Sequence, residues 1–138
     1  MEESFVEKNV RTYLKKRGWK LTNLPKSVGQ HGEDITAWHP KWRKILKIEA
    51  KGDGRSNKIQ MKHSGFYTVL GQILSRMDIQ GNSPNRARIY ALAIPSHWEK
   101  TFTNKIAKMK YGWRLLRLKV FLVNEDGSVD EKPFSHWL

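Results

Sequence analysis

Two runs of alternating polar and apolar residues, separated by a short turn, most constrain the fold of this chain. EDITAW (residues 33–38) and KILKIEAK (residues 44–51) each send every second side chain to one face, which is the period of a β-strand. His39 and Pro40 begin the turn, so the two runs predict a hairpin. One face of the second strand is predicted to carry Leu46, Ile48 and Ala50, and the other Ile45, Lys47, Glu49 and Lys51.

Three segments show apolar residues at helical spacing. The first covers residues 4–16 and is ended by Gly18, and the second covers residues 64–79. The third begins at Ser96, where Ser-x-x-Glu forms a capping box, and stops at Gly112. The core stripe of the second helix is predicted to be Phe66, Leu70, Ile73, Leu74 and Met77.

The remaining patterns are strands, and their order predicts the fold class. WKLTNL (residues 19–24) is a short strand, RIYALAI (88–94) a central strand, and RLLRLKVFLV (114–123) a last long strand before an EDG turn. A helix, a strand meander and then alternating helices and strands indicate a three-layer α-β-α domain with a central mixed sheet. The length of 138 residues predicts a single domain over 1–138.

Charge narrows the class of partner. Lys and Arg number 26 against 13 Asp and Glu, which gives a net charge of +13 and indicates a polyanionic partner such as DNA. The excess is concentrated in residues 41–62 and 98–119. There is no cysteine, no histidine pair at zinc-ligand spacing and no apolar run long enough to cross a membrane, and the acidic, polar first residues MEESFVEKNV do not resemble a signal peptide. We expect a soluble, cytoplasmic protein.

The hairpin brings a chemically distinctive set together. If its strands pair, Asp34 lies beside Glu49, and Lys51 projects from the same face as Glu49. Two adjacent carboxylates repel each other unless a cation lies between them, and carboxylate oxygens suit Mg²⁺ or Mn²⁺. A lysine beside such an ion positions or deprotonates water, which equips the site to hydrolyse a phosphodiester. The simpler alternative is a surface ion pair between Glu49 and a neighbouring lysine.

These motifs resemble the PD-(D/E)XK superfamily of restriction-endonuclease-like nucleases, and within it the archaeal Holliday-junction resolvases. The resemblance covers about residues 4–80 and depends on Glu7 twelve residues before Trp19, Asp34 in GED, Glu49 and Lys51 in IEAKG, and Gln72 in LGQIL. The proline of the family motif is absent, since Glu33 precedes Asp34; in a regular strand Glu33 points to the opposite face, which favours Asp34 as the ligand.

The resemblance implies a restriction-endonuclease-like fold and a metal-dependent endodeoxyribonuclease acting on junction or branched DNA, with 5′-phosphate products. Asp34, Glu49 and the Ala50 carbonyl would hold Mg²⁺, with Mn²⁺ able to substitute, and Lys51 would position or activate water. Gln72 would support the site. Glu7 has two readings: a second metal ligand, or the Glu of a Ser-x-x-Glu capping box that starts at Ser4.

Further expectations concern DNA contacts, oligomeric state and alternative functions. Backbone contacts are expected from Arg55, Lys58, Lys41, Arg43 and Arg76. The tryptophans are interpreted mainly as core residues, with stacking of Trp38 or Trp42 on a base as the less favoured reading. A homodimer is favoured if both strands are cut. The alternatives are a nucleic-acid-binding module without catalysis and a subunit of a larger nuclease complex.

Overall fold

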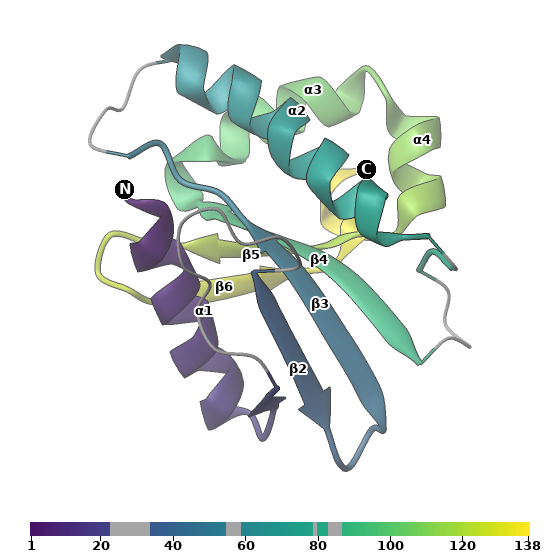
Figure 1. Ribbon diagram of the computed structural model, residues 1–138. Coiled ribbons are helices and arrows are strands. Elements are labelled where there is room, and N and C mark those ends of the chain that lie inside the picture. Colours follow the sequence, from purple (N-terminus) through teal and green to yellow (C-terminus); the bar gives the residue numbers. More distant parts are fainter. Residues whose placement is uncertain (23–33, 55–58, 79, 83–86) are drawn as a thin grey trace.

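A single mixed β-sheet forms the centre of the molecule (Figure 1). The computed structural model describes residues 1–22, 34–54, 59–78, 80–82 and 87–138. The strands lie in chain order: β1 (Lys20–Leu21), β2 (Ile35–His39), β3 (Lys44–Ala50), β4 (Arg88–Pro95), β5 (Lys119–Val123) and β6 (Val129–Lys132). β3, β4 and β5 are parallel, whereas β1, β2 and β6 join as antiparallel strands at the two sides. The predicted hairpin and the α/β class with a mixed sheet are confirmed.

Helices cover both faces of the sheet (Figure 1). α1 (Glu3–Lys16) packs on one face, where Val6, Val10 and Leu14 are fully buried. The other face carries α2 (Ile59–Arg76), α3 (Glu99–Ala107), α4 (Lys110–Leu116) and the two 3₁₀-helices η1 (Ser96–Trp98) and η2 (Phe134–Trp137). Two apolar cores therefore lie on either side of the sheet. Among the described residues, no helix is long and apolar enough to cross a bilayer.

The two sheet faces follow the predicted alternation of β3. Leu46, Ile48 and Ala50 are buried on the α1 side. The opposite positions, Ile45 and Lys47, are only half-buried, and Glu49 is covered by α2. One face of β3 is therefore buried against α1 along its length. The other face is covered by α2 only near Glu49, at the C-terminal end of the strand.

Helix boundaries were the weakest part of the sequence prediction. The capping box at Ser96 is wrong: Ser96 starts η1, α3 begins at Glu99, and Glu99 accepts a hydrogen bond from His136 at 2.9 Å. α2 begins before residue 64 and ends at Arg76, three residues short of the predicted end. Its core stripe includes the fully buried Val69, whereas Leu74 is 40% exposed.

The predicted long strand over residues 114–123 is also wrong in its first half. α4 runs through Gly112 and includes residues 114–116, so that only Lys119–Val123 is a strand. Arg117 separates the two with a left-handed backbone at φ 51°. A left-handed residue is a common way to end a helix, and here it turns the chain from α4 into β5.

Candidate active site

Asp34 and Glu49 lie side by side at the open end of the β2–β3 hairpin. Ile35 pairs with Ile48, which puts the residue before β2 next to the end of β3. Asp34 Oδ2 accepts a hydrogen bond of 2.7 Å from the backbone amide of Ala50, and the two carboxyl groups are themselves hydrogen-bonded. Both side chains are nearly inaccessible, with Asp34 7% and Glu49 2% exposed. The hairpin thus places two buried carboxyls in direct contact.

This arrangement perturbs the ionisation of Glu49. Burial, followed by the negative charge of Asp34, raises the pKa of Glu49 to about 7. Desolvation and a like charge both disfavour the carboxylate, so the pair holds a proton near neutral pH unless a cation replaces it. Strongly perturbed carboxyls of this kind are concentrated at functional sites.

Arg76, on α2, partly offsets the repulsion between the Asp34 and Glu49 carboxyl groups. Its Nε donates a 3.1 Å hydrogen bond to Glu49 Oε1 from the last residue of α2. The Arg76 side chain is 28% exposed, so the guanidinium closes the site toward solvent. Arg76, predicted to contact DNA, is therefore a member of the carboxylate cluster in this structure.

Glu7 is held by an arginine that also reaches Asp34. Arg11 Nη2 donates to Glu7 Oε1 at 3.0 Å and to the backbone carbonyl of Asp34 at 2.7 Å. The capping-box reading of Glu7 is wrong, because α1 begins at Glu3 and Glu2 at its N-cap makes no side-chain cap bond. Arg11, which is only 8% exposed, ties the start of β2 to α1.

A fourth carboxylate, Glu3, was missed by the sequence analysis. Lys51 Nζ lies 3.6 Å from Glu3 Oε1, so the lysine pairs with the first turn of α1. Burial raises the pKa of Glu3 and the charges of Asp34 and Glu7 raise it further, whereas Lys51 lowers it. Its spacing of four residues from Glu7, which puts both on one helix face, was the available signal.

Gly52 explains how α1 comes so close to Lys51. A Cβ on Gly52 would lie 2.6 Å from both the backbone nitrogen of Glu3 and the carbonyl oxygen of Met1. Only a residue without a side chain allows the first turn of α1 to rest on the chain that leaves β3. The glycine after IEAK therefore sets the distance between Glu3 and Lys51.

The other predicted residues fall in different places. Gln72 lies on α2 one turn before Arg76, so the two share a helix face, and its side chain is exposed. Lys41 and Arg43 lie in the turn at the opposite end of β3 from Glu49. At the rise of a β-strand, six residues separate Arg43 from Glu49 by roughly 20 Å. Glu33, Arg55 and Lys58 lie outside the described residues.

The donor set fits a hard dication with few protein ligands. Among the described residues there is no group of three or more His, Cys, Asp and Glu placed to hold a metal ion. Mg²⁺ does not require one, because it commonly keeps several waters and takes one or two carboxylates together with substrate phosphates. Asp34 and Glu49 supply two carboxylates whose mutual repulsion such an ion would relieve.

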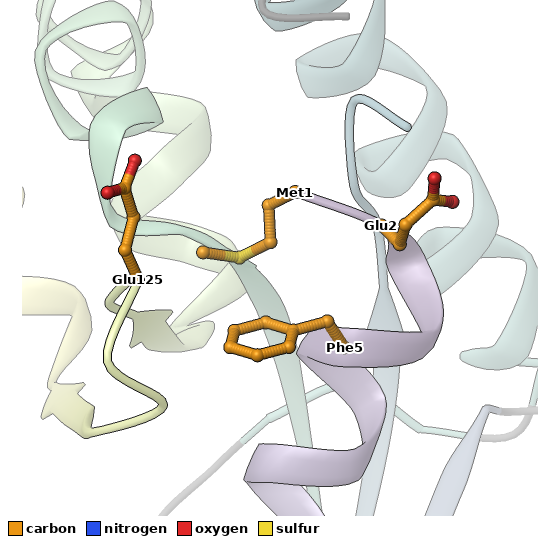
Figure 2. A pocket seen from close by; sticks show the side chains of 4 residues that line it. All are labelled: Met1, Glu2, Phe5 and Glu125. Carbon is orange, nitrogen blue, oxygen red and sulfur yellow. The ribbon is translucent and has the colours of Figure 1, made fainter. Parts of the chain in front are cut away.

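A separate cavity of about 310 Å³ lies beside the start of α1 (Figure 2). It is lined by Met1, Glu2, Phe5 and Glu125, so that it joins the first turn of α1 to the turn between β5 and β6. Its ionisable side chains, those of Glu2 and Glu125, are both acidic, and the N-terminal ammonium of Met1 is already paired with Asp53 at 2.7 Å. A phosphate is repelled by such a lining, so this cavity is not part of the candidate active site.

Comparison with known proteins supports the fold. No family model matches the chain, and no curated protein matches it. Among solved structures, it is similar to the crystal structure of an XisH family protein from Nostoc punctiforme PCC 73102, with a TM-score of 0.59 and 21% sequence identity. The match covers 94% of this chain and 98% of that chain. At this level of identity the likeness shows a common α/β fold.

Proposed function

We propose that this chain is a metal-dependent endodeoxyribonuclease with a restriction-endonuclease-like fold. The observation that carries the proposal is the buried Asp34–Glu49 pair, in which the pKa of Glu49 is raised to about 7. A protein does not gain stability from two contacting buried carboxyls, so their placement calls for a ligand that needs them. A divalent cation beside a phosphodiester is such a ligand.

Each charged group then has a role at the proposed site. Asp34, Glu49 and the Ala50 carbonyl would hold Mg²⁺ or Mn²⁺, and such an ion would supply Lewis-acid chemistry for the phosphodiester and for the attacking water. Lys51 lies two residues beyond Glu49, and its ammonium stabilises negative charge that develops on the phosphate. Glu3 holds Lys51 in place at 3.6 Å, while Arg11 fixes Asp34 through its backbone carbonyl.

DNA is the proposed substrate because of the charge. The net charge of +13 is concentrated in residues 41–62 and 98–119. The second segment covers α3, α4 and the start of β5, on the same side of the sheet as Arg76. Binding that depends on phosphate neutralisation should weaken steeply as salt rises.

Cleavage of a panel of labelled DNAs tests the proposal. Duplex, single strand, flap and four-way junction are incubated with Mg²⁺, Mn²⁺ or EDTA. We expect metal-dependent cutting that leaves 5′-phosphate ends and that falls at least a hundredfold in Lys51→Met. Lys132→Met is the control, because Lys132 is also a lysine on a strand of the sheet but lies outside both basic segments. Equal loss in both lysine variants would remove the special role of Lys51.

One observation favours binding without cutting as the second candidate function. Arg76 pairs with Glu49 and Lys51 with Glu3, so protein cations already balance part of the negative charge. In that case the acidic cluster is structural, and the basic surface alone meets nucleic acid. Calorimetric titration with Mn²⁺ in the presence of DNA separates the two: the nuclease takes up metal, whereas the binding module gives no heat beyond that of Asp34→Asn.

A further inference from the structure

The face of the hairpin next to Glu49 forms a second cavity, distinct from the carboxylate cluster. β2 and β3 extend past the end of α2 (Figure 1), and a hollow of about 360 Å³ lies on them. It is lined by Thr22, Thr36, Ala37, Trp38, Ile45, Lys47 and Arg88. Three neighbouring strands contribute to it, since Thr36 pairs with Lys47 and Ile45 with Arg88.

The lining combines three kinds of chemistry. Lys47 and Arg88 bring positive charge, Trp38 brings a half-buried aromatic ring, and Thr22 and Thr36 bring hydroxyl groups. A nucleotide needs these same three: cations for phosphate, a ring on which a base stacks, and polar groups for the sugar. The volume falls at the lower end of the range typical of small-ligand clefts, which suits one nucleotide.

The strand register connects this cavity to the carboxylates. Lys47 precedes Glu49 by two residues, so both side chains leave β3 on the same face, roughly 7 Å apart along the strand. Thr36 is likewise two residues after Asp34, on the strand paired with β3. A DNA strand lying along the hairpin would therefore pass from the Asp34–Glu49 pair directly onto Lys47 and Trp38.

We propose that this cavity binds one unpaired nucleotide beside the phosphodiester that is cut, so that the substrate carries a single-stranded segment at the cleavage point. The inference rests on the proposed nuclease function and adds its substrate class. The base must be unpaired because the faces of bases in a duplex are covered by their neighbours, and Trp38 can stack only on an exposed face. Lys47 and Arg88 then hold the adjoining phosphates.

Binding without cleavage tests this directly. Glu49→Gln protein in EDTA is titrated with a labelled oligo(dT) and with a blunt duplex, and fluorescence anisotropy gives the dissociation constants. Trp38→Leu should weaken oligo(dT) binding roughly 5- to 150-fold, the range for loss of one stacked base, and should leave duplex binding within twofold. Lys47→Met and Arg88→Met should each lower the salt dependence of oligo(dT) binding by about 0.7 in slope.

Two controls keep the outcome interpretable. Tyr111→Leu removes an aromatic ring that is 77% exposed on α4, and Lys132→Met removes a lysine of β6 outside both basic segments; neither should change the preference for oligo(dT). If Trp38→Leu does not fold, Trp38→Phe retains a stacking ring and should bind oligo(dT) within about threefold of the parent.

The results separate this inference from the nuclease proposal. Loss of oligo(dT) binding in the Trp38 and Lys47 variants supports the nucleotide site even if no DNA is cut under any metal. An equal loss on duplex and oligo(dT) overturns it, because the cavity then contacts a duplex backbone. Unchanged binding in these variants also overturns it, and leaves any metal-dependent cutting by Asp34 and Glu49 intact.

Discussion

Replacing Glu49 with glutamine should make metal-free protein more stable at alkaline pH. In the folded protein, burial and the charge of Asp34 raise the pKa of Glu49 from 4.5 to about 7. Between those values the unfolded chain ionises this group while the folded chain keeps its proton, so stability falls as pH rises. Glutamine has nearly the same shape, accepts the hydrogen bond from Arg76, and carries no charge.

The size of the effect follows from that shift. Each pKa unit corresponds to about 1.4 kcal/mol, so a rise from 4.5 to about 7 sets an upper limit of about 3–4 kcal/mol. Arg76 is 28% exposed, which lets water screen the pair, and the contact with Asp34 divides the proton between two groups. We therefore expect wild type to lose about 2 kcal/mol relative to Glu49→Gln between pH 4.5 and pH 8.

Urea unfolding in EDTA, at half-unit steps from pH 4.5 to 8.5, measures this difference. The free energy of unfolding of Glu49→Gln minus that of wild type should be smallest at pH 4.5 and level off above about pH 7.5. Glu131→Gln serves as the control, because this glutamate pairs with Lys119 on a neighbouring strand outside the site. A difference that is constant with pH, or that shrinks as pH rises, would refute the reasoning.

Three further changes probe how the site is supported. Gly52→Ala should cost about 1–3 kcal/mol in urea unfolding, because its Cβ would lie 2.6 Å from two backbone atoms at the start of α1. Gly71 lies on α2, and a Cβ added there would meet nothing within 4 Å, so Gly71→Ala should raise the free energy of unfolding by about 0.5–1 kcal/mol. A loss of stability would contradict the assignment of this segment to a helix. Asp53→Asn should cost about 2–3 kcal/mol at pH 7, because the buried carboxylate bonds the N-terminal ammonium, His97 and Trp98 at 2.7, 2.6 and 3.2 Å. Burial opposes the ionisation of Asp53, but these bonds hold its pKa below its ordinary value. The stability that the carboxylate contributes is therefore lost as pH falls below about 4. Thermal melts should show this acid loss of stability in wild type and not in Asp53→Asn.

The sequence was most informative where a local period decides the structure. Alternation over β2 and β3 predicted the hairpin, and the hairpin placed Asp34 against Glu49. Successive side chains of a strand alternate between the two faces of the sheet. Once Ile48 and Ala50 are buried on one face, Glu49 must lie on the other.

Contacts between distant segments were beyond the reach of local patterns. The Ser-x-x-Glu pattern at Ser4 predicts a helix start, yet α1 begins earlier because Met1 and Glu3 rest on Gly52. The pairing of Glu3 with Lys51 joins residues 48 positions apart: the spacing of Glu3 and Glu7 puts both on one helix face, but no local pattern specifies Lys51 as the partner. The buried face of α2 was also mispredicted, because packing against α3 and the sheet decides which side of the helix is covered. Val69 belongs to the core, whereas Leu74, which the sequence analysis placed there, is exposed.

Cleavage of labelled branched DNA by wild type, Glu49→Gln and Glu131→Gln, with Mg²⁺ or with EDTA, tests the central claim most directly. The account predicts cutting in Mg²⁺ by wild type and by Glu131→Gln, none by Glu49→Gln, and none by any of them in EDTA. Cutting by Glu49→Gln at the wild-type rate would contradict a catalytic role for the Asp34–Glu49 pair. Tight, salt-sensitive binding of wild type without cutting in Mg²⁺ or Mn²⁺ would contradict the nuclease itself.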